Sequence, residues 1–487
     1  MAKARMRDVV ILLPGIMGSV LQRHGKDVWA ISGTAISRAL ITTGGSIADL
    51  FLAADDPSVN DLGDGVKATR VFPDAHIVPG FVRIDGYSRI KQMIMDEFDV
   101  QDGAFTEHVP GDIRLDRPGT FFEFPYDWRR DNRASARRLK QLAEQALVER
   151  RKTVPDAKLV LLAHSMGGLV SRYYLECLDG WKDCRTLVTF GTPYRGAVQT
   201  IDYLANGFRK MVELKMVSDM ARSFTSMYQL LPIYKALKTG DEWRRVAETE
   251  GVPNIDRERS AQALAFHREI EKAVEQRRST AEGAAAYTLI PFVGTAQETL
   301  LSAEIQGGKI TTSRNAPAWI APEFGVGDGT VPQVSAIPIE MEGIVETYLA
   351  ARHGSLQQHT QVLEDLRHRL ARVQTPGLAA IRGPGPAQEP SRPDLSLDVD
   401  DFFLREEPVL VQARIKGAST PPQDIVATVS RADGPGTQLK LRMEEHDGQW
   451  RGEIAGLEPG LYRVEVRTRP GGPSAALPVH ELFEVSD

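Results

Sequence analysis

Short apolar runs recur along the first large region of the chain, and helical patterns separate some of them. Within residues 133–151, Leu139, Leu142 and Leu147 recur with the period of a helix that buries one face. Apolar strands that alternate with helices are typical of a parallel sheet covered on both faces. The runs that predict buried strands are Val9–Gly15, Thr120–Trp128, Lys158–His164, Cys184–Pro193 and Ala286–Gly294. We therefore expect an α/β fold for this region.

The pattern changes between Ala197 and about Glu282, where mostly helical sequence carries many charges. This long insertion lies between two strand candidates, at a place where a lid over an active site could be attached. We therefore expect a helical lid over residues 197–282.

The last part of the chain follows a period of two. Residues 375–396 are rich in proline and glycine, as a linker is. Beyond them apolar and polar residues alternate, with turn signals between the runs. The alternating apolar residues are Ile425, Ala427, Val429, Leu439, Leu441, Met443, Tyr462, Val464 and Val466. The pattern predicts an immunoglobulin-like β-sandwich, and it divides the chain into domains at 1–374 and 397–487 joined by the linker.

Length and composition agree with more than one folded domain. The chain has 487 residues, which is more than one core usually supports. Its net charge of -6 gives no basic footprint, so we expect no nucleic-acid partner. The apolar run Val9–Leu13 is too short for a signal peptide, and no apolar segment is long enough to span a bilayer. The chain has only two cysteines, so we expect no disulfide framework and a reducing compartment. We therefore expect a cytoplasmic protein.

Ser165 stands in a sequence typical of a nucleophile elbow. The strand candidate that ends at His164 runs directly into Ser-Met-Gly-Gly and a segment of helical character. Such a turn lifts a serine hydroxyl to the edge of the sheet, and the residues two before and two after it must be small. Gly167 meets this need, and Ala163 stands where the first glycine is usual. The alternative is a glycine-rich turn without chemistry.

A serine nucleophile needs a base, and the base needs an acid to orient it. Asp328 lies between glycines on a predicted tight loop, and His353 precedes a helix predicted over residues 357–370. The chain order Ser, Asp, His is that of α/β-hydrolases. We therefore predict Ser165, Asp328 and His353 as the catalytic residues.

Other titratable residues compete for these roles. His359 and Asp365 both fall within the predicted helix, where His359 is less free to reach the serine and Asp365 reads as a solvated charge. His164 is adjacent to the serine, so we expect its side chain to point away and to pack or form a supporting hydrogen bond.

The oxyanion of an acyl-transfer intermediate needs two preorganised N–H donors. We predict the backbone N–H of Met166, directly after the serine, and that of Ile16 in the glycine-containing loop after the first strand. This loop lacks a full dinucleotide fingerprint or a Walker lysine. The spacing of Cys177 and Cys184 matches no common zinc motif, and the reaction needs no metal or cofactor.

These motifs together resemble the lecithin:cholesterol acyltransferase family of α/β-hydrolases. The matching segments occur in the family's order, from Val9 to about Leu370. They are "PGIMGS" (14–19), "FPYDWRR" (124–130), "AHSMGG" (163–168), "FGTPYRG" (190–196), "SMYQLLP" (226–232) and "GDGTVP" (327–332), followed by His353. The resemblance implies an acyl-ester mechanism on lipids, with the triad and oxyanion roles given above. It implies a structural role beside the site for the "YDWR" motif.

We expect a serine hydrolase that cleaves acyl esters of lipids through an acyl-enzyme. Transfer of the acyl group to an alcohol would make it a lipid O-acyltransferase, and a non-lipid carboxylesterase is a further alternative. A further alternative, from a different class of function, is a binding or effector scaffold whose sandwich recognises an unknown partner.

A lipid substrate requires contact with a membrane or micelle. The basic cluster at residues 129–140 could touch anionic headgroups, or it could be a solvated helix face. The segment 41–56 could be a mobile apolar flap or plain core. Met211, Met216, Met220 and Met227 in the insertion could pack onto the domain or form a flexible acyl-chain surface.

Overall fold

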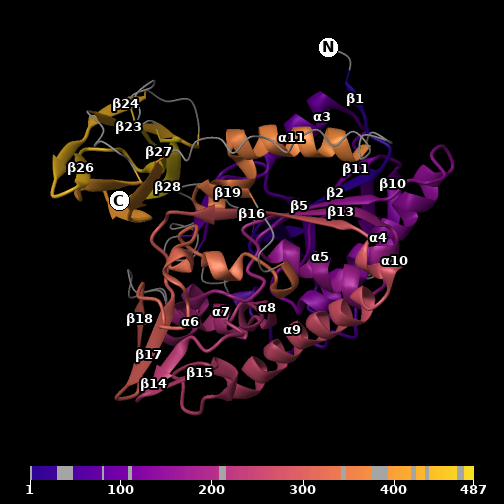
Figure 1. Ribbon diagram of the computed structural model, residues 1–487, viewed down its shortest axis with the longest axis horizontal. Coiled ribbons are helices and arrows are strands. Elements are labelled where there is room, and N and C mark those ends of the chain that lie inside the picture. Colours follow the sequence, from indigo (N-terminus) through magenta and orange to yellow (C-terminus); the bar gives the residue numbers. More distant parts are fainter. Residues whose placement is uncertain are drawn as a thin grey trace.

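The computed structural model describes residues 3–29, 48–78, 82–107, 112–207, 215–341, 347–374, 393–417, 424–433, 438–468 and 476–487. A six-stranded sheet lies at the centre of its N-terminal part, with helices on both sides (Figure 1). Every neighbouring pair of its strands is parallel. In spatial order the strands are β11 (Phe121–Glu123), β2 (Val9–Leu13), β12 (Leu159–His164), β13 (Cys184–Phe190), β16 (Thr288–Thr295) and β19 (Thr347–Ala350). The predicted α/β-hydrolase type of fold, with a covered parallel sheet, is confirmed.

The central strands are apolar throughout because both faces of the sheet are buried. Val9 and Ile11 of β2 pack into one hydrophobic cluster with helices α4 and α5. Val10 and Leu12 point to the opposite face and pack with α3 and α11. The four covering helices are α3 (Ser88–Glu97), α4 (Asn132–Arg151), α5 (Met166–Cys177) and α11 (Thr360–Gln374).

Two boundaries differ from those expected, and one strand was not predicted. The strand predicted over residues 120–128 ends at Glu123, because Pro125 has no N–H to donate to a ladder and the chain turns into the core. Strand β19 has four residues and no clear apolar run, and was not foreseen. The helix predicted to begin at residue 357 begins at Thr360, after a 3-10 segment over His353–Gln358.

The insertion is not helical throughout. A β-hairpin from it pairs with a second hairpin that follows β16, and together they form a four-stranded sheet. The helices of the insertion are α6 (Val198–Asn206), α7 (Lys215–Ser223), α8 (Thr225–Tyr228), α9 (Arg257–Arg278) and α10 (Ala281–Ala284). The strands of this sheet are β14 (Leu237–Thr239), β15 (Glu242–Arg244), β17 (Ser302–Gln306) and β18 (Lys309–Ser313).

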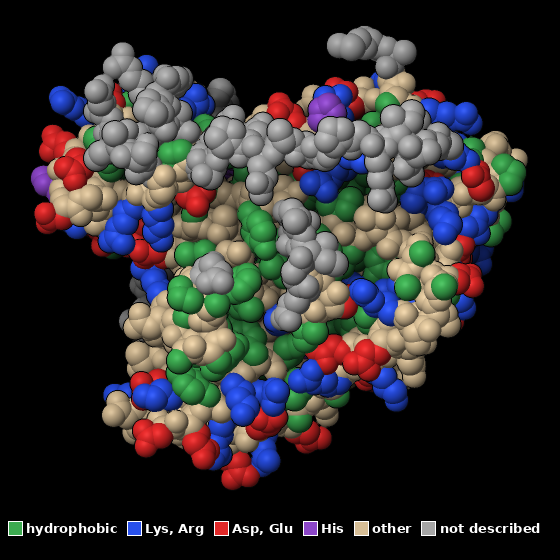
Figure 2. All heavy atoms as spheres, viewed as in Figure 1, with side chains coloured by type: hydrophobic (Ala, Val, Ile, Leu, Met, Phe, Trp, Pro, Cys, Tyr) green, Lys and Arg blue, Asp and Glu red, His purple; other side chains and the backbone are tan. Residues whose placement is uncertain are grey.

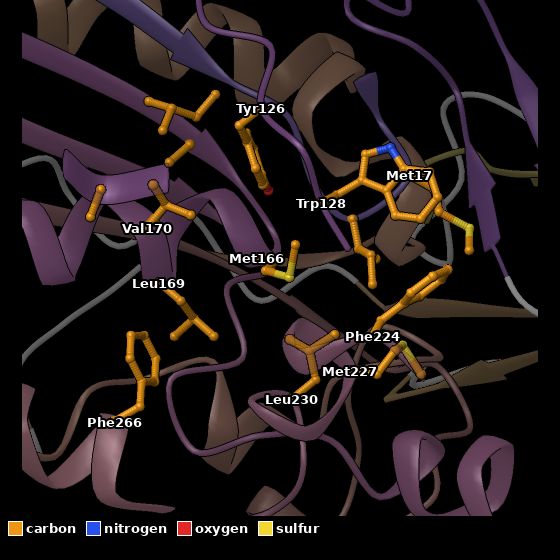
Figure 3. Packing of buried hydrophobic residues seen from close by; sticks show 14 of the residues in the cluster. Met17, Tyr126, Trp128, Met166, Leu169, Val170, Phe224, Met227, Leu230 and Phe266 are labelled. Carbon is orange, nitrogen blue, oxygen red and sulfur yellow. The ribbon is translucent and has the colours of Figure 1, made fainter. Parts of the chain in front are cut away.

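Trp128 joins the central sheet to the insertion. Its buried ring makes edge contacts with Trp29 and with Phe224, at centroid distances of 5.2 and 5.4 Å. Figure 3 shows Phe224 and Met227 of the insertion facing the same cluster as Met166. The insertion is therefore packed on the body of the fold through aromatic and sulfur-containing side chains.

Short elements surround the sheet. The short strands are β1 (Ala4–Arg5), β3 (Ser19–Arg23), β4 (Lys26–Trp29), β5 (Val66–Val71), β6 (His76–Val78), β7 (Val82–Ile84), β8 (Phe98–Asp99), β9 (Ala104–Glu107) and β10 (Ile113–Arg117). The 3-10 segments are η1 (Gly180–Lys182), η3 (Val246–Glu248), η4 (Pro322–Phe324), η5 (Gln333–Ser335), η6 (Ile339–Met341) and η7 (His353–Gln358).

The C-terminal strands form two sheets around a separate apolar core, which we call the C-terminal sandwich (described residues from 393 to 487). As predicted, Ile425, Ala427 and Val429 point inward, whereas Leu439 on the edge strand is exposed. Most of its strand pairs are antiparallel, and β21 pairs parallel with β28. Its strands are β20 (Asp394–Val399), β21 (Phe402–Leu404), β22 (Val409–Lys416), β23 (Ile425–Arg431), β24 (Leu439–Arg442), β25 (Glu444–His446), β26 (Gln449–Ile454), β27 (Gly460–Thr468) and β28 (Val479–Ser486). The predicted domain boundaries stay a prediction, and most of the linker lies outside the described residues.

Candidate active site

Ser165 lies on the sharp turn between β12 and α5. Its backbone has φ 51° and ψ −124°, a region that costs a non-glycine residue about 1–3 kcal/mol. Crowding around the turn requires small residues. A Cβ on Gly167 would lie 2.5 Å from the carbonyl oxygen of Pro14, and one on Gly168 would lie 2.0 Å from Thr192 Oγ1. The strained turn is thus held by close packing, with the serine at the carboxyl end of the sheet.

The structure brings the three predicted catalytic residues together. His353 Nε2 lies 2.9 Å from Ser165 Oγ, and His353 Nδ1 lies 2.7 Å from Asp328 Oδ2. Asp328 is 1% exposed, and its other carboxylate oxygen accepts the N–H groups of Thr330 and Val331 at 3.0 and 2.7 Å. These bonds fix the carboxylate, so it can hold the imidazole with Nδ1 protonated and Nε2 facing the hydroxyl.

The competing residues lie elsewhere. Asp365 is on α11, where it pairs with Arg369 at 2.7 Å. His359 precedes α11 instead of lying within it, so that prediction was wrong. Its buried ring faces the C-terminal sandwich, with Nε2 at 3.4 Å from the carbonyl oxygen of Pro478. Neither residue faces Ser165.

His164 points away from the serine and forms a supporting hydrogen bond, as expected. Its Nδ1 lies 2.8 Å from Tyr87 Oη, and its Nε2 lies 3.1 Å from the carbonyl oxygen of His353. Tyr87 Oη also accepts the Gly15 N–H at 2.8 Å. Burial raises the pKa of Tyr87 far above its ordinary value, so the phenol stays protonated and donates to His164. Sequence reasoning missed Tyr87, which has no motif of its own.

Of the two predicted oxyanion donors, Met166 follows the serine in the chain and Ile16 lines the same cavity. Met166 is the first residue of α5, where backbone N–H groups lack helical partners. Ile16 lies in the turn that Gly18 N closes onto Gly15 O at 3.1 Å, and it lines the same cavity as Ser165. Because Tyr87 takes the Gly15 N–H, the Ile16 N–H is the next donor along this loop.

Ser165 and His353 open into a cavity of about 650 Å³. One part of its wall is apolar and includes Met227 and Leu230 of the insertion. Another part is charged and comes from three different regions of the chain. The charged lining residues besides Asp328 are Arg83, Asp202, Arg314, Arg352, Asp400, Asp401 and Glu481. The cavity is therefore amphipathic, with the serine and histidine in its wall.

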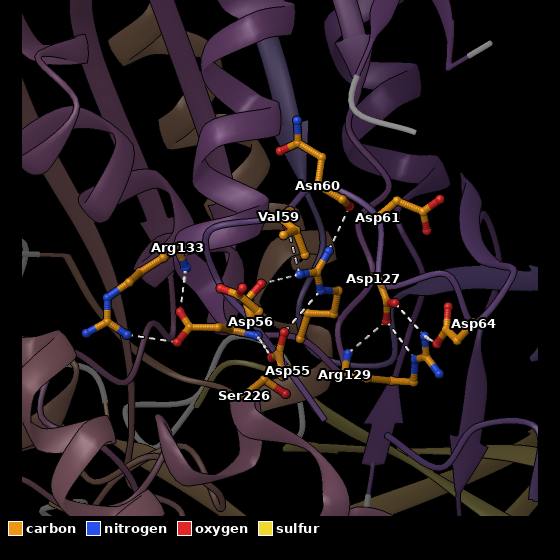
Figure 4. Close-up of polar contacts among 12 residues, drawn as sticks. Asp55, Asp56, Val59, Asn60, Asp61, Asp64, Asp127, Arg129, Arg133 and Ser226 are labelled. Carbon is orange, nitrogen blue, oxygen red and sulfur yellow. Dashed lines mark hydrogen bonds and ion pairs between the residues drawn. The ribbon is translucent and has the colours of Figure 1, made fainter. Parts of the chain in front are cut away.

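Asp127 and Arg129 of the "YDWR" motif belong to a buried polar cluster (Figure 4). Arg129 is 0% exposed and pairs with Asp127 and Asp64 at 2.7 and 2.8 Å. Burial alone would raise the pKa of Asp127, but Arg129 and Arg130 hold it below its ordinary value. Ser226 of the "SMYQLLP" segment donates to the carbonyl oxygen of Trp128 at 2.5 Å. The motif thus ties the insertion to the sheet.

This cluster corrects the interpretation of residues 129–140 as a headgroup site or a solvated face. Arg130 is not a solvated side chain. It is 6% exposed and donates to three backbone carbonyls within residues 56–60. Arg138 is 9% exposed and pairs with Glu107. Several of these arginines therefore serve buried ion pairs. On the face seen in Figure 2, basic and acidic side chains are interspersed.

The other candidates for membrane contact divide between core and surface. Leu50 and Leu52 are buried in the main core, while Phe51 between them is 39% exposed. Met220 and Met227 are buried, and Met216 is exposed. Met211 and residues 41–47 lie outside the described part of the chain. No helix within the described ranges has the length and hydropathy needed to cross a membrane.

Both cysteines are free thiols; Cys184 is buried, and Cys177 is half-buried. Burial raises the pKa of Cys177 to about 12, which leaves it protonated and a poor nucleophile. Among the described residues there is no group of three or more His, Cys, Asp or Glu side chains that could hold a metal ion.

Comparison with known proteins finds one family and several relatives. The lecithin:cholesterol acyltransferase family matches residues 113–291, which confirms the resemblance over this segment. The lysosomal phospholipase A and acyltransferase of Homo sapiens is 32% identical over 114 residues, and that of Canis lupus familiaris is 30% identical over 114 residues. These stretches cover 22% of this chain and 27% and 28% of the relatives. The chain thus matches only about a quarter of the length of these relatives. The expected cytoplasmic location of this chain stays a prediction.

Among solved structures, the propeptide form of Bacillus licheniformis lipase BlEst2 aligns over 98% of this chain and 93% of its own. The sequence identity is 9% and the TM-score is 0.30. With a TM-score this low, the alignment supports no conclusion about the fold or the function of this chain.

Proposed function

We propose that this chain is a serine hydrolase of the lecithin:cholesterol acyltransferase family that cleaves acyl esters of lipids. The observation that carries the proposal is the hydrogen-bonded series Ser165 Oγ, His353 Nε2, His353 Nδ1 and Asp328 Oδ2, with distances of 2.9 and 2.7 Å, at the wall of an amphipathic cavity. The match of residues 113–291 to the family supports the same chemistry.

In the proposed reaction, His353 Nε2 takes the proton of Ser165 as the hydroxyl oxygen attacks the ester carbonyl. Asp328 accepts the hydrogen bond from Nδ1–H and stabilises the imidazolium that forms. The N–H groups of Ile16 and Met166 donate to the oxyanion. His353 then gives its proton to the leaving alcohol, and an acyl group remains on Ser165. Water activated by His353 hydrolyses this acyl-enzyme and restores the serine.

A lipid ester fits the two kinds of wall in the cavity. Met227 and Leu230 offer apolar surface for an acyl chain, and methionine adapts to chains of different shape. The charged lining residues suit a polar headgroup. A purely apolar or purely polar ester would leave one wall unmatched, so the cavity favours an amphipathic substrate over a small non-lipid ester.

An acyltransferase reaction is the second candidate. It uses the same acyl-enzyme and replaces water by an alcohol, and the relatives that match this chain carry acyltransferase in their names. The two reactions are distinguished by the product, which is a free fatty acid or a new ester. The alternative of an inert scaffold is disfavoured by the intact hydrogen-bonded series.

The test combines an active-site probe with a lipid panel. Wild type, Ser165→Ala, His353→Ala and the surface control His368→Ala are treated with a fluorophosphonate and read by intact mass. We expect labelling of wild type and His368→Ala only. Each protein is then assayed on mixed phospholipid and triacylglycerol, with and without an added long-chain alcohol, for fatty acid and for new ester.

Absence of labelling in folded wild type would overturn the proposed nucleophile. Labelling without turnover of any lipid would retain the serine chemistry and reject the lipid assignment. New ester in preference to fatty acid would identify a transferase.

A further inference from the structure

The C-terminal sandwich touches the loop that carries the proposed base. Glu481 on β28 pairs with Arg352, the residue before His353, at 2.6 Å between carboxylate oxygen and Nε. The same carboxylate oxygen lies 3.3 Å from Arg83 Nη1. The side chains of Glu481 and Arg352 are each 9% exposed. Two arginines of the α/β region therefore share one carboxylate from the sandwich.

The sandwich also touches the loop that carries the proposed acid. The side-chain amide of Gln297, 0% exposed, donates to the carbonyl oxygen of Leu395 at 3.0 Å and accepts the N–H of Leu397 at 3.1 Å. The backbone of Gln297 exchanges hydrogen bonds with Gly327, directly before Asp328, at 3.0 and 3.3 Å. One residue thus joins the first strand of the sandwich to the acid loop.

A third contact lies on the other side of the base. Asp85 is 6% exposed and pairs with Arg463 and with His480, the latter at 3.0 Å. Its backbone N–H donates to the carbonyl oxygen of Gly354, the residue after His353, at 2.9 Å. Burial acts to raise the pKa of Asp85, but its contacts with His480 and Arg463 hold it below its ordinary value. Both chain neighbours of His353 are therefore linked to the sandwich, Arg352 through Glu481 and Gly354 through Asp85.

The sandwich contributes to the cavity itself. Asp400 and Asp401, between β20 and β21, line the cavity together with Glu481. Arg83, which faces them across the interface, donates to the carbonyl oxygen of Val399 at 3.2 Å. Part of the wall that a substrate meets is thus built by a region outside the α/β fold.

We propose that the C-terminal sandwich completes the active site, with Glu481 as a positioning residue that holds the loop of His353 through Arg352. The inference rests on the proposed function for the identity of the base. A buried ion pair that loses one partner leaves an uncompensated charge, so the arginine must move toward solvent. Arg352 is joined to His353 by one peptide bond, and its movement displaces the imidazole. Displacement by about 1 Å can slow a reaction by about a hundredfold.

The test uses the full chain with Glu481→Gln, the shorter acid Glu481→Asp, and Glu458→Gln as the matched control. Glu458 belongs to the same sandwich and pairs with Arg405 in an exposed position away from the cavity. The rate constant for fluorophosphonate labelling is measured together with the final labelled fraction and the thermal unfolding curve. We expect Glu481→Gln to reach the wild-type final fraction about tenfold to a hundredfold more slowly. Glu481→Asp should recover part of the rate, and Glu458→Gln should match wild type.

If Glu481→Gln folds and is labelled at the wild-type rate, the inference is overturned, even if the melting temperature falls. A merely structural role would lower stability without changing the labelling rate per folded molecule. If Glu481→Gln does not fold, the double variant Arg352→Gln/Glu481→Gln removes both charges of the pair. Slow labelling of the folded double variant supports the inference, and a wild-type rate rejects it.

A second readout separates this inference from the proposed function. Hydrogen–deuterium exchange over residues 352–356 should rise in Glu481→Gln and stay unchanged in Glu458→Gln. If wild type is not labelled at all, the proposed function fails, and the exchange result alone decides whether the sandwich holds this loop.

Discussion

Tyr87 Oη lies 2.8 Å from His164 Nδ1, and this contact links the loop of Gly15 and Ile16 to the loop of His353. The phenol accepts the Gly15 N–H on one side, and His164 Nε2 faces the His353 carbonyl on the other. Since Tyr87 donates to Nδ1, His164 carries its proton on Nε2 and donates it to that carbonyl. The relative position of Ile16 and His353 therefore depends on Tyr87, which is hydrogen-bonded to Gly15 and His164.

Tyr87→Phe should slow labelling of the serine as well as lower stability. The change leaves the buried Gly15 N–H and His164 Nδ1 without their partner, at a cost of about 1–3 kcal/mol in unfolding free energy. We expect the labelling rate to fall about tenfold as the oxyanion turn relaxes. Tyr462→Phe is the control, because it removes a tyrosine hydroxyl from the C-terminal sandwich, where Oη donates to the Glu458 carbonyl at 2.6 Å. Equal rates for the two variants would contradict the positioning role.

Gly191→Ala should separate the acid from the base. Gly191 has φ 58°, and a Cβ there would lie 2.8 Å from Asp328 Oδ2 and 2.9 Å from His353 Nδ1. Gly240→Ala is the matched control, since Gly240 has φ 61° and nothing within 4 Å of an added Cβ. Both variants incur the left-handed backbone cost of about 1–2 kcal/mol. We expect labelling to fall by about a hundredfold or more in Gly191→Ala only. Denaturation midpoints and labelling rates of both variants check this.

Asp328→Asn should retain the fold and remove most of the activity. The asparagine Oδ1 can still accept from Thr330 and Val331, but its NH₂ group meets His353 Nδ1 and favours the tautomer with Nε2 protonated. That tautomer cannot accept the proton of Ser165, and the loss in kcat is about ten-thousand-fold. Asp365→Asn, on the surface of α11, should keep wild-type turnover. Retained activity in Asp328→Asn would reject this residue as the acid.

Asp127→Asn should destabilise the protein in a pH-dependent way. Removal of one partner of a buried ion pair costs about 3–5 kcal/mol near neutral pH. Because the pKa of Asp127 is depressed in the folded state, its contribution is present above the unfolded pKa of about 4 and is lost as pH falls through the folded value. The difference in unfolding free energy between wild type and variant should therefore shrink below about pH 4. Urea unfolding at about pH 7 and about pH 3 measures it, and a constant difference would contradict the ion-pair account.

The sequence by itself determined the parallel sheet, the turn at Ser165 and the chain order of the three candidate residues. Each rests on local chemistry: apolar runs make buried strands, and a sharp strand-to-helix turn admits only small residues such as Gly167 and Ala163. The contact between the glycine-flanked Asp328 and His353 could also be predicted, because a tight loop leaves a carboxylate free to reach a histidine. The catalytic assignments themselves remain predictions until the labelling experiment is done.

Only the tertiary structure decided how these parts are held. Tyr87 and His164 are 77 residues apart, Gln297 and Leu395 are 98 apart, and no periodicity marks such pairs. Likewise, the sequence allows Arg129 to be a solvated charge. In the fold it is buried, because Asp64 and Asp127 form ion pairs with it. Burial of a charge depends on partners from segments that are distant in the sequence. Packing of the C-terminal sandwich against the loops of Asp328 and His353 depends on the same kind of contact.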